Sequence, residues 1–244
     1  MVIQNQKGSA LAIILAVLPV FIAGALLCFS LLGILQNDLG LKYQCRVEGQ
    51  NGQKRVAPLL SSLLALNPVA VAVKAELAEA ILELEAAIAS ENPVAIAKAT
   101  KHYTQVLEKR DKLDHRQKQL IKQSDLLLQQ SHTFTSMNLR RTGGSASNIL
   151  LKVDLDSVRG KAPKLAVRPD SPDIAPTYSP VDDFENKQAL AHEWQYRVQV
   201  RPPFSNFLKG EFSFKKACAV SLAKENSSWL PKIIVGKYSL KSVW

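Results

Sequence analysis

The 244-residue sequence is poor in the residue types that usually carry catalysis or metal binding. It has three cysteines and four histidines, and neither a Cys-x2-Cys nor a His-x3-His spacing occurs, which excludes the common kinds of zinc site. Glycine-rich phosphate loops and nucleophile elbows are also missing. The acidic groups at 154–156 and 182–185 lack the ligand spacing of a calcium loop. We therefore expect a protein that is not an enzyme and that uses no metal or cofactor.

Charge is absent from the N-terminal part of the chain. No charged residue occurs between Ser9 and Leu35, and an apolar helix of this length would measure about 39 Å, more than the hydrocarbon core of a bilayer. A cleaved signal peptide has a much shorter apolar core. The bulky Leu27 directly before Cys28 argues against lipoprotein processing. The sequence therefore predicts a short N-terminal flank at 1–8 and a single-pass transmembrane signal-anchor helix at 9–36.

Three small or rigid residues mark this helix. Pro19 is expected to kink it, because proline lacks the backbone N–H that a helix interior needs. Gly24 and Gly33 offer small surfaces that a neighbouring helix could approach. Their alternative role is that of tolerated small residues facing lipid.

The remainder of the chain is basic. It has 30 basic and 21 acidic residues, a net charge of +9. Such an excess suits an acidic partner surface, such as lipid headgroups or an anionic envelope polymer, although it also simply favours solubility. The basic residues are scattered and not gathered with aromatics, so nucleic acid is not an expected partner.

Residues 37–57 read as a polar stalk, in which the Gly-rich EGQNG at 48–52 is expected to interrupt any helix. The region 58–141 follows, and Asn-Pro pairs divide it into helices. The first long helix is acidic, and we expect one of its faces to carry Val73, Leu77, Ile81, Leu84 and Ile88. The second is basic and places Ala99, Val106, Leu113, Leu120 and Leu127 in a coiled-coil-like row. Opposite charge predicts an antiparallel hairpin, which is either an interaction arm or two solvated helices packed on a sheet.

The region 142–244 changes to a period of two. Alternation at 149–155 and at 194–200, with two or three later segments, predicts an antiparallel sheet of about four strands. A Pro-rich stretch at 161–183 is expected to be a long loop. The sequence thus predicts an α+β architecture: a transmembrane helix, a helical hairpin and a C-terminal sheet.

Two cysteines lie outside the apolar run. Cys45 follows the anchor and Cys218 lies in an expected strand. In an exported domain they are available for a disulfide, and the alternative is two unrelated buried thiols.

The two ends of the chain resemble the TadE/TadG-type pseudopilins of tight-adherence pilus systems. QKGSALAIILAVLPVFIAGALL, from Gln6 to Leu27, is similar to the start of that family, and YRVQVRPPFSNFLKGEFSFKKACAV is similar to its late strands. The resemblance covers about a quarter of the chain. It implies a pilin-like architecture, with Gly8 and Ser9 at the junction that a prepilin peptidase cuts. Where TadE proteins and type IV pilins carry a glutamate, this chain has Ile13, which favours the uncleaved, TadG-like role.

The resemblance also implies a place and a function. The helix would lie in the bacterial cytoplasmic membrane with the ectodomain outside, although the basic residues after the helix, taken alone, favour the opposite orientation. The chain would be a structural or assembly component of a pilus or secretion apparatus, would act through protein–protein contacts and could form oligomers. A second hypothesis is a membrane-tethered module that binds an anionic envelope polymer or lipid surface.

Overall fold

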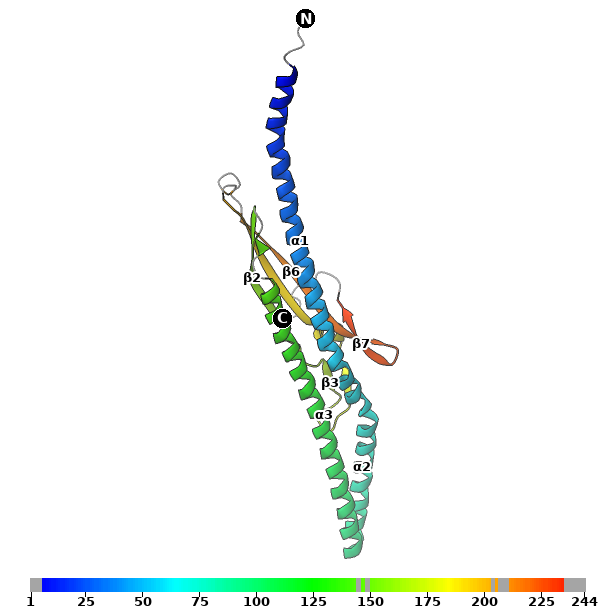
Figure 1. Cartoon of the computed structure of the whole chain (residues 1–244). Helices are drawn as coiled ribbons and strands as arrows, with labels where there is room; N and C mark the ends of the chain where they lie inside the picture. Colours follow the sequence, from blue (N-terminus) through cyan, green and yellow to red (C-terminus); the bar gives the residue numbers. More distant parts are fainter. Residues whose placement is uncertain (1–5, 144–145, 148–149, 203–204, 206–210, 235–244) are drawn as a thin grey trace. The chain divides into compact units, whose positions relative to one another are not determined.

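The computed structural model describes residues 6–143, 146–147, 150–202, 205 and 211–234, with residues 6–13 and 146–147 described by their backbone alone (Figure 1). It confirms the predicted α+β fold, in which long helices precede an antiparallel sheet. The helices are α1 (Gln6–Ala65), α2 (Asn67–Ala89), α3 (Pro93–Thr142) and α4 (Phe184–Lys187). The strands are β1 (Ala146–Ser147), β2 (Leu151–Lys161), β3 (Val167–Pro169), β4 (Tyr178–Pro180), β5 (Leu190–Val200), β6 (Glu211–Glu225) and β7 (Ser228–Ile233).

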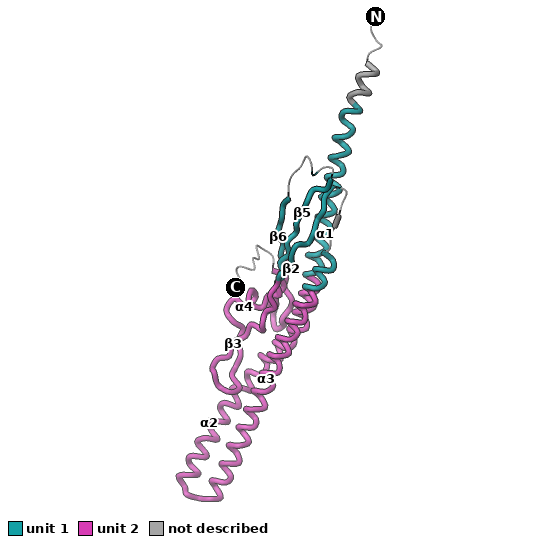
Figure 2. The backbone as a smooth tube through the Cα atoms, turned by 90° about the vertical axis from the view of Figure 1, so that its left-hand side faces the viewer, with its two compact units in different colours: residues 1–45, 136–159, 192–217 teal, residues 46–135, 160–191, 218–244 magenta. Residues whose placement is uncertain are grey.

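The main sheet has the strand order β1-β2-β5-β6-β7. Strands β6 and β7 form an antiparallel hairpin whose register runs from Val220 opposite Ile233 to Glu225 opposite Ser228. The alternation expected in β5 is confirmed, because Trp194, Tyr196 and Val198 are buried. The chain divides into two compact units (Figure 2). Unit 1 comprises residues 1–45, 136–159 and 192–217, and unit 2 comprises residues 46–135, 160–191 and 218–244.

In unit 1, α1 contributes one buried row at helical spacing. Ser30, Ile34, Asp38, Leu41 and Cys45 are each less than a tenth exposed and follow one another at intervals of three or four residues. This row begins inside the apolar run and continues past it. One side of α1 is therefore part of the core of unit 1 from Ser30 onward.

In unit 2, α1 continues without a break through 48–52, where the sequence predicts an interruption. That prediction is wrong because the glycines serve close packing. A Cβ added to Gly49 would lie 2.8 Å from Val220 Cγ2, and one added to Gly52 would lie 2.7 Å from Ser131 Cβ. Both distances are shorter than van der Waals contact. Residues 37–57, expected to form a stalk, are continuous helix.

An apolar core of unit 2 joins α1, α3 and the β-rich segments. Val56, Leu60 and Leu63 of α1 pack with Leu128 of α3, and the cluster also includes Leu165, Phe184 and Leu222. The ring of Phe184 lies against that of Trp229, with centroids 4.9 Å apart. Each fully buried side chain of this size contributes about 1.5–3 kcal/mol, so this cluster holds α1 and α3 to the later segments around residues 165, 184 and 222.

Helices α2 and α3 form the predicted antiparallel hairpin (Figure 2). The Asn92 carboxamide oxygen accepts hydrogen bonds from the backbone N–H groups of Val94 and Ala95 and so caps α3. Polar side chains meet across the hairpin: Lys109 forms an ion pair with Glu76, and His102 Nδ1 lies 2.8 Å from a carboxylate oxygen of Glu83. Surface pairs of this kind contribute about 0–1 kcal/mol each. They therefore stabilise the fold little and mainly favour this alignment of α2 along α3.

The buried face of α2 differs from the expected one. Ala70, Val73, Ala80 and Ala87 form it, whereas Ile81 and Ile88 are 39% and 56% exposed. Of the predicted face, Val73 is buried and Leu77 and Leu84 are partly buried. The prediction is wrong for Ile81 and Ile88 because it followed the large apolar residues, and small ones allow the two helices to approach closely. The expected row on α3 is buried at Ala99, Val106 and Leu113, and later on the helix Leu128 is buried while Leu127 is partly exposed.

The Pro-rich stretch 161–183 is more ordered than the sequence indicates. It contains strands β3 and β4, which pair antiparallel from Val167 opposite Pro180 to Pro169 opposite Tyr178. Polar side chains of the helices hold it in place: Asn67 exchanges two hydrogen bonds with the Tyr178 backbone, and Asp125 accepts one from the Leu165 N–H. Its expected description as a long loop is therefore wrong, because these partners lie 40 to 111 residues away in the sequence.

Asp170, beside β3, carries a testable pH dependence. Hydrogen bonds from Thr177, together with the Lys74 ammonium 3.3 Å away, lower the pKa of this carboxyl from 3.8 to about 2. A lowered pKa in the folded state stabilises the fold above about pH 4, and this contribution is lost as the pH falls toward 2. We expect Asp170→Asn to reduce the acid dependence of the unfolding midpoint in that interval. The exposed Asp173→Asn is the matched control, and an equal change in both variants would contradict the assignment.

Candidate functional site

The N-terminal part of α1 is exposed on all sides. Val20 and Phe21 are 70% and 72% exposed, and Ile14, Leu18 and Phe29 are likewise exposed. In Figure 1 this part of the helix runs without another element beside it. An apolar helix so exposed is unfavourable in water. It is long and apolar enough to cross a membrane.

The structure refines where a membrane segment would end. Ser30 is only 3% exposed, so the fold already covers one side of α1 at that residue. The described residues 14–29 are therefore largely exposed, and with the uncharged residues 9–13 of the sequence they give an apolar stretch of about 32 Å as a helix, which matches the hydrocarbon thickness of about 30 Å. The sequence places the end at residue 36 because Leu31, Leu32 and Leu35 are also apolar, and composition alone does not show which side of the helix is covered.

A buried polar group follows this stretch directly. Asp38 is buried, and one of its carboxylate oxygens lies 2.7 Å from Lys42 Nζ, one helical turn later. Tyr196 of β5 is buried in the same unit, and its ring centroid lies 5.0 Å from that of Phe214. Burial, with a further contribution from the Asp38 charge, raises the pKa of the Tyr196 hydroxyl. Sequence reasoning missed Asp38, although its i,i+4 spacing to Lys42 is visible in the sequence.

The residues predicted to mark the membrane helix all lie within α1. Gly8 and Ser9 are helical, and their side chains lie outside the described part of the structure. The helix continues through Pro19. A Cβ added to Gly24 would have no neighbour within 4 Å, and Gly33 is partly buried. Gly24 thus leaves an open surface on α1, while Gly33 lies where the fold begins to cover the helix.

The three cysteines differ in state. Cys28 is free and exposed, whereas Cys45 and Cys218 are disulfide-bonded. The predicted pairing of Cys45 with Cys218 has a direct test. We expect a tryptic digest without reductant to contain residues 43–46 joined to residues 217–224, and we expect this species to disappear on reduction. A joined peptide that contains Cys28 would contradict the pairing.

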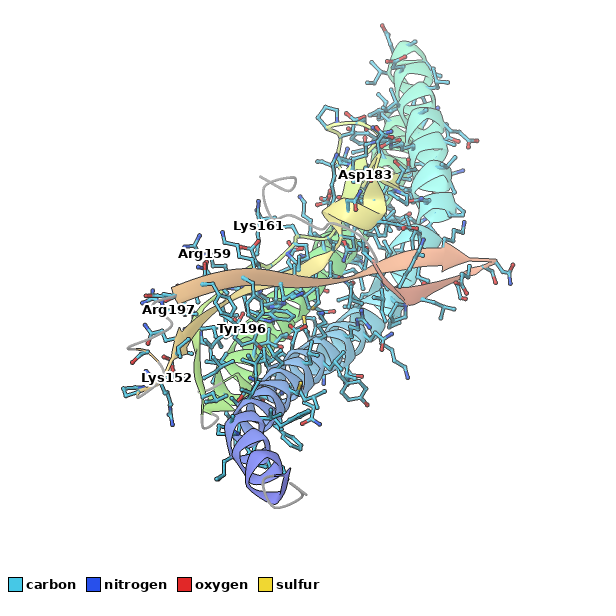
Figure 3. The ribbon with its side chains drawn as sticks, turned by 90° about the horizontal axis from the view of Figure 1, so that it is seen from above. Lys152, Arg159, Lys161, Asp183, Tyr196 and Arg197 are labelled. Atoms are coloured by element: carbon cyan, nitrogen blue, oxygen red, sulfur yellow. The ribbon has the colours of Figure 1, made fainter. Side chains whose placement is uncertain are left out.

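Charged side chains on the exposed face of the strands in unit 1 are largely paired with one another. Arg197 of β5 contacts Asp156 at 3.0 Å and Glu211 at 3.1 Å, and Lys152 contacts Asp154 at 2.8 Å (Figure 3). Among the described residues, no group of three or more His, Cys, Asp or Glu side chains is placed to hold a metal ion. This face therefore offers exposed ion pairs.

Unit 2 contains a cavity of about 480 Å³. Its lining is mainly apolar and includes Leu165, Val167, Val181 and Ala189, and lysines also border it: Lys161, Lys164 and Lys187. An apolar lining with ammonium groups beside it suits a ligand that has an apolar body and an anionic end. Sequence reasoning did not find this cavity, because its lining comes from the Pro-rich stretch, α4 and β5.

Comparison with known proteins finds no relative of the chain. No family model, curated protein or solved structure matches the chain.

Proposed function

We propose that the chain is a membrane-anchored structural component of a pilus-type or secretion assembly and acts through protein–protein contacts. The observation that carries the proposal is the division of α1, a single helix of 60 residues. Its N-terminal part is apolar and exposed, while its later part is buried along one row from Ser30 onward. One rigid element thus joins an apolar segment of bilayer length to the ectodomain core.

Two features support a role in assembly. First, the outer side of α1 stays apolar beyond the membrane-length stretch: Leu35, Leu39 and Tyr43 are exposed and follow one another at intervals of four residues. A helix whose apolar face continues past the bilayer suits lateral packing against another helix. Second, exposed carboxylates on α2, among them Glu79 and Glu85, make no ion pair with the described residues and are available to a partner.

Intact-mass measurement of the protein purified from membranes tests which kind of component it is. A full-length mass is the expected result, because Ile13 stands where processed pilins carry a glutamate. A mass lacking residues 1–8 would instead make the chain a processed subunit.

Photo-cross-linkers at Leu39 and Tyr43, with the control position Asn51, test the assembly role itself. We expect adducts with envelope proteins from the first two positions, and adducts with lipid alone would contradict the role.

The lysine-bordered cavity favours a second candidate function, a membrane-tethered module for an anionic envelope polymer or lipid. Binding of that kind should weaken steeply with salt, because exposed lysines are screened within about 8 Å at physiological ionic strength. We expect a double Lys164→Glu, Lys187→Glu variant to lose such binding. Retention of unchanged binding by this variant, or insensitivity to salt, would exclude this function for the cavity.

A further inference from the structure

Helix α2 carries a second apolar face, on the side opposite α3. Val71, Ala75, Ala78 and Leu82 follow one another at intervals of four, three and four residues, as on one face of a helix. They lie about half a turn away from the buried Val73 and Ala80. Val71 and Leu82 are 58% and 66% exposed. The side chains that α2 buries against its own hairpin partner are therefore different from these.

Acidic side chains flank this outer face. Glu79 and Glu85 are exposed and make no ion pair with the residues that the structure describes. They differ in this from Glu76 and Glu83, which pair with α3. The outer face of α2 is thus apolar in its centre and negative at its edges. It suits a helix face that has bulky apolar side chains with positive charges beside them.

Helix α3 presents such a face elsewhere on unit 2. Leu126 and Phe134 are each 54% exposed, although both are large and apolar. Arg116 and Lys122, on the preceding turns, are exposed and make no ion pair with described residues. Gln123, Leu126, Gln130 and Phe134 follow one another at intervals of three, four and four residues, so they share one face of α3. This face lies away from the buried Leu128.

We propose that the outer face of α2 in one copy of this chain packs against the outer face of α3 in a second copy. The two faces complement each other in charge, negative against positive. They also complement each other in shape, because the bulky Leu126 would enter the space above the small Ala75 and Ala78. A contact between two α2 faces would instead bring acidic edges together. A head-to-tail contact of this kind continues as an open row or a closed ring, and a reciprocal contact closes as a two-fold dimer.

This contact would be how copies of the chain join in the assembly, so it rests on the proposed function. Its test uses the full-length chain in membranes, with Cys28→Ser as the background. One copy carries Leu82→Cys and a second, differently tagged copy carries Leu126→Cys. A short bis-maleimide should join the two tags in mixed membranes, and each variant alone should give little product. Asn51→Cys with Leu126→Cys is the control, and we expect it to stay unjoined.

Charge reversal separates a specific contact from random collision. A double Glu79→Lys, Glu85→Lys change in the Leu82→Cys copy should reduce cross-linking about tenfold. Arg116→Glu with Lys122→Glu in the other copy should restore it. Cross-linking by Leu82→Cys alone, none in the mixture, or no response to charge reversal would each overturn the self-contact. Those results would not contradict the proposed function. An ectodomain on the cytoplasmic side would contradict the proposed function and not the self-contact.

Discussion

Gln53→Leu is expected to lower the free energy of unfolding by about 2–4 kcal/mol, since it leaves buried hydrogen-bonding groups without a partner. Gln53 is completely buried, and its amide donates to the backbone oxygens of Gln188 at 2.8 Å and Val220 at 3.2 Å. The Gln188 side chain donates back to Gln53 and accepts from the Ala166 N–H at 2.8 Å. One amide on α1 thus ties together three other segments of unit 2.

Tryptophan fluorescence during urea unfolding of the full-length chain in detergent measures this effect, because Trp229 packs against Phe184 in the same unit. Gln105→Leu is the matched control. Gln105 is exposed on α3, and we expect its replacement to change the unfolding free energy by less than about 0.5 kcal/mol. Equal, small effects from both substitutions would contradict a structural role for the Gln53 amide.

The second large effect concerns two glycines of α1 that the same substitution should affect in opposite directions. Gly52→Ala is expected to destabilise the chain by about 1–3 kcal/mol, because the new methyl would lie 2.6 Å from Ser131 Oγ and 2.7 Å from Ser131 Cβ. Gly40→Ala is expected to stabilise it by about 0.5–1 kcal/mol, since alanine favours helix and no atom lies within 4 Å of the new methyl.

Thermal and urea midpoints of both variants, measured in the same detergent, test the pair. A stabilising Gly52→Ala would show that α1 and α3 can separate at this point without cost. Adding Ser131→Gly to Gly52→Ala should recover part of the lost stability. No recovery would place the cause elsewhere in the helix.

The same glycines show how far the sequence predicts the fold. Local periodicity correctly predicts the exposed apolar run, the hairpin and the burial of Trp194, Tyr196 and Val198, because each pattern lies within one element. It does not distinguish Gly40, which is open, from Gly52, which faces Ser131. That difference depends on a residue 79 positions away. The order of the Pro-rich stretch likewise depends on Asn67 and Asp125, which the stretch does not contain.

The candidate site is likewise only partly predictable from the sequence. Composition predicts a membrane-length helix, but only burial of Ser30 places the end of its free part at residue 29. On α2, the rule that large apolar residues face inward fails at Ile81 and Ile88, because the alanine row gives the closer helix contact. Because alanines face α3, the larger Val71 and Leu82 lie on the outer face of α2. It is visible only once the inner face is known.

Protease accessibility in intact spheroplasts, with an alkaline carbonate wash of membranes from a parallel sample, shows whether the apolar part of α1 anchors an external ectodomain. We expect the chain to stay in the washed membranes and external trypsin to remove the ectodomain from the spheroplasts. A protected fragment should then end at Lys42 or Arg46, the first basic residues after the apolar stretch. Release of the chain by carbonate would contradict the membrane anchor, and an ectodomain that external trypsin cannot reach would contradict its position outside the cytoplasm.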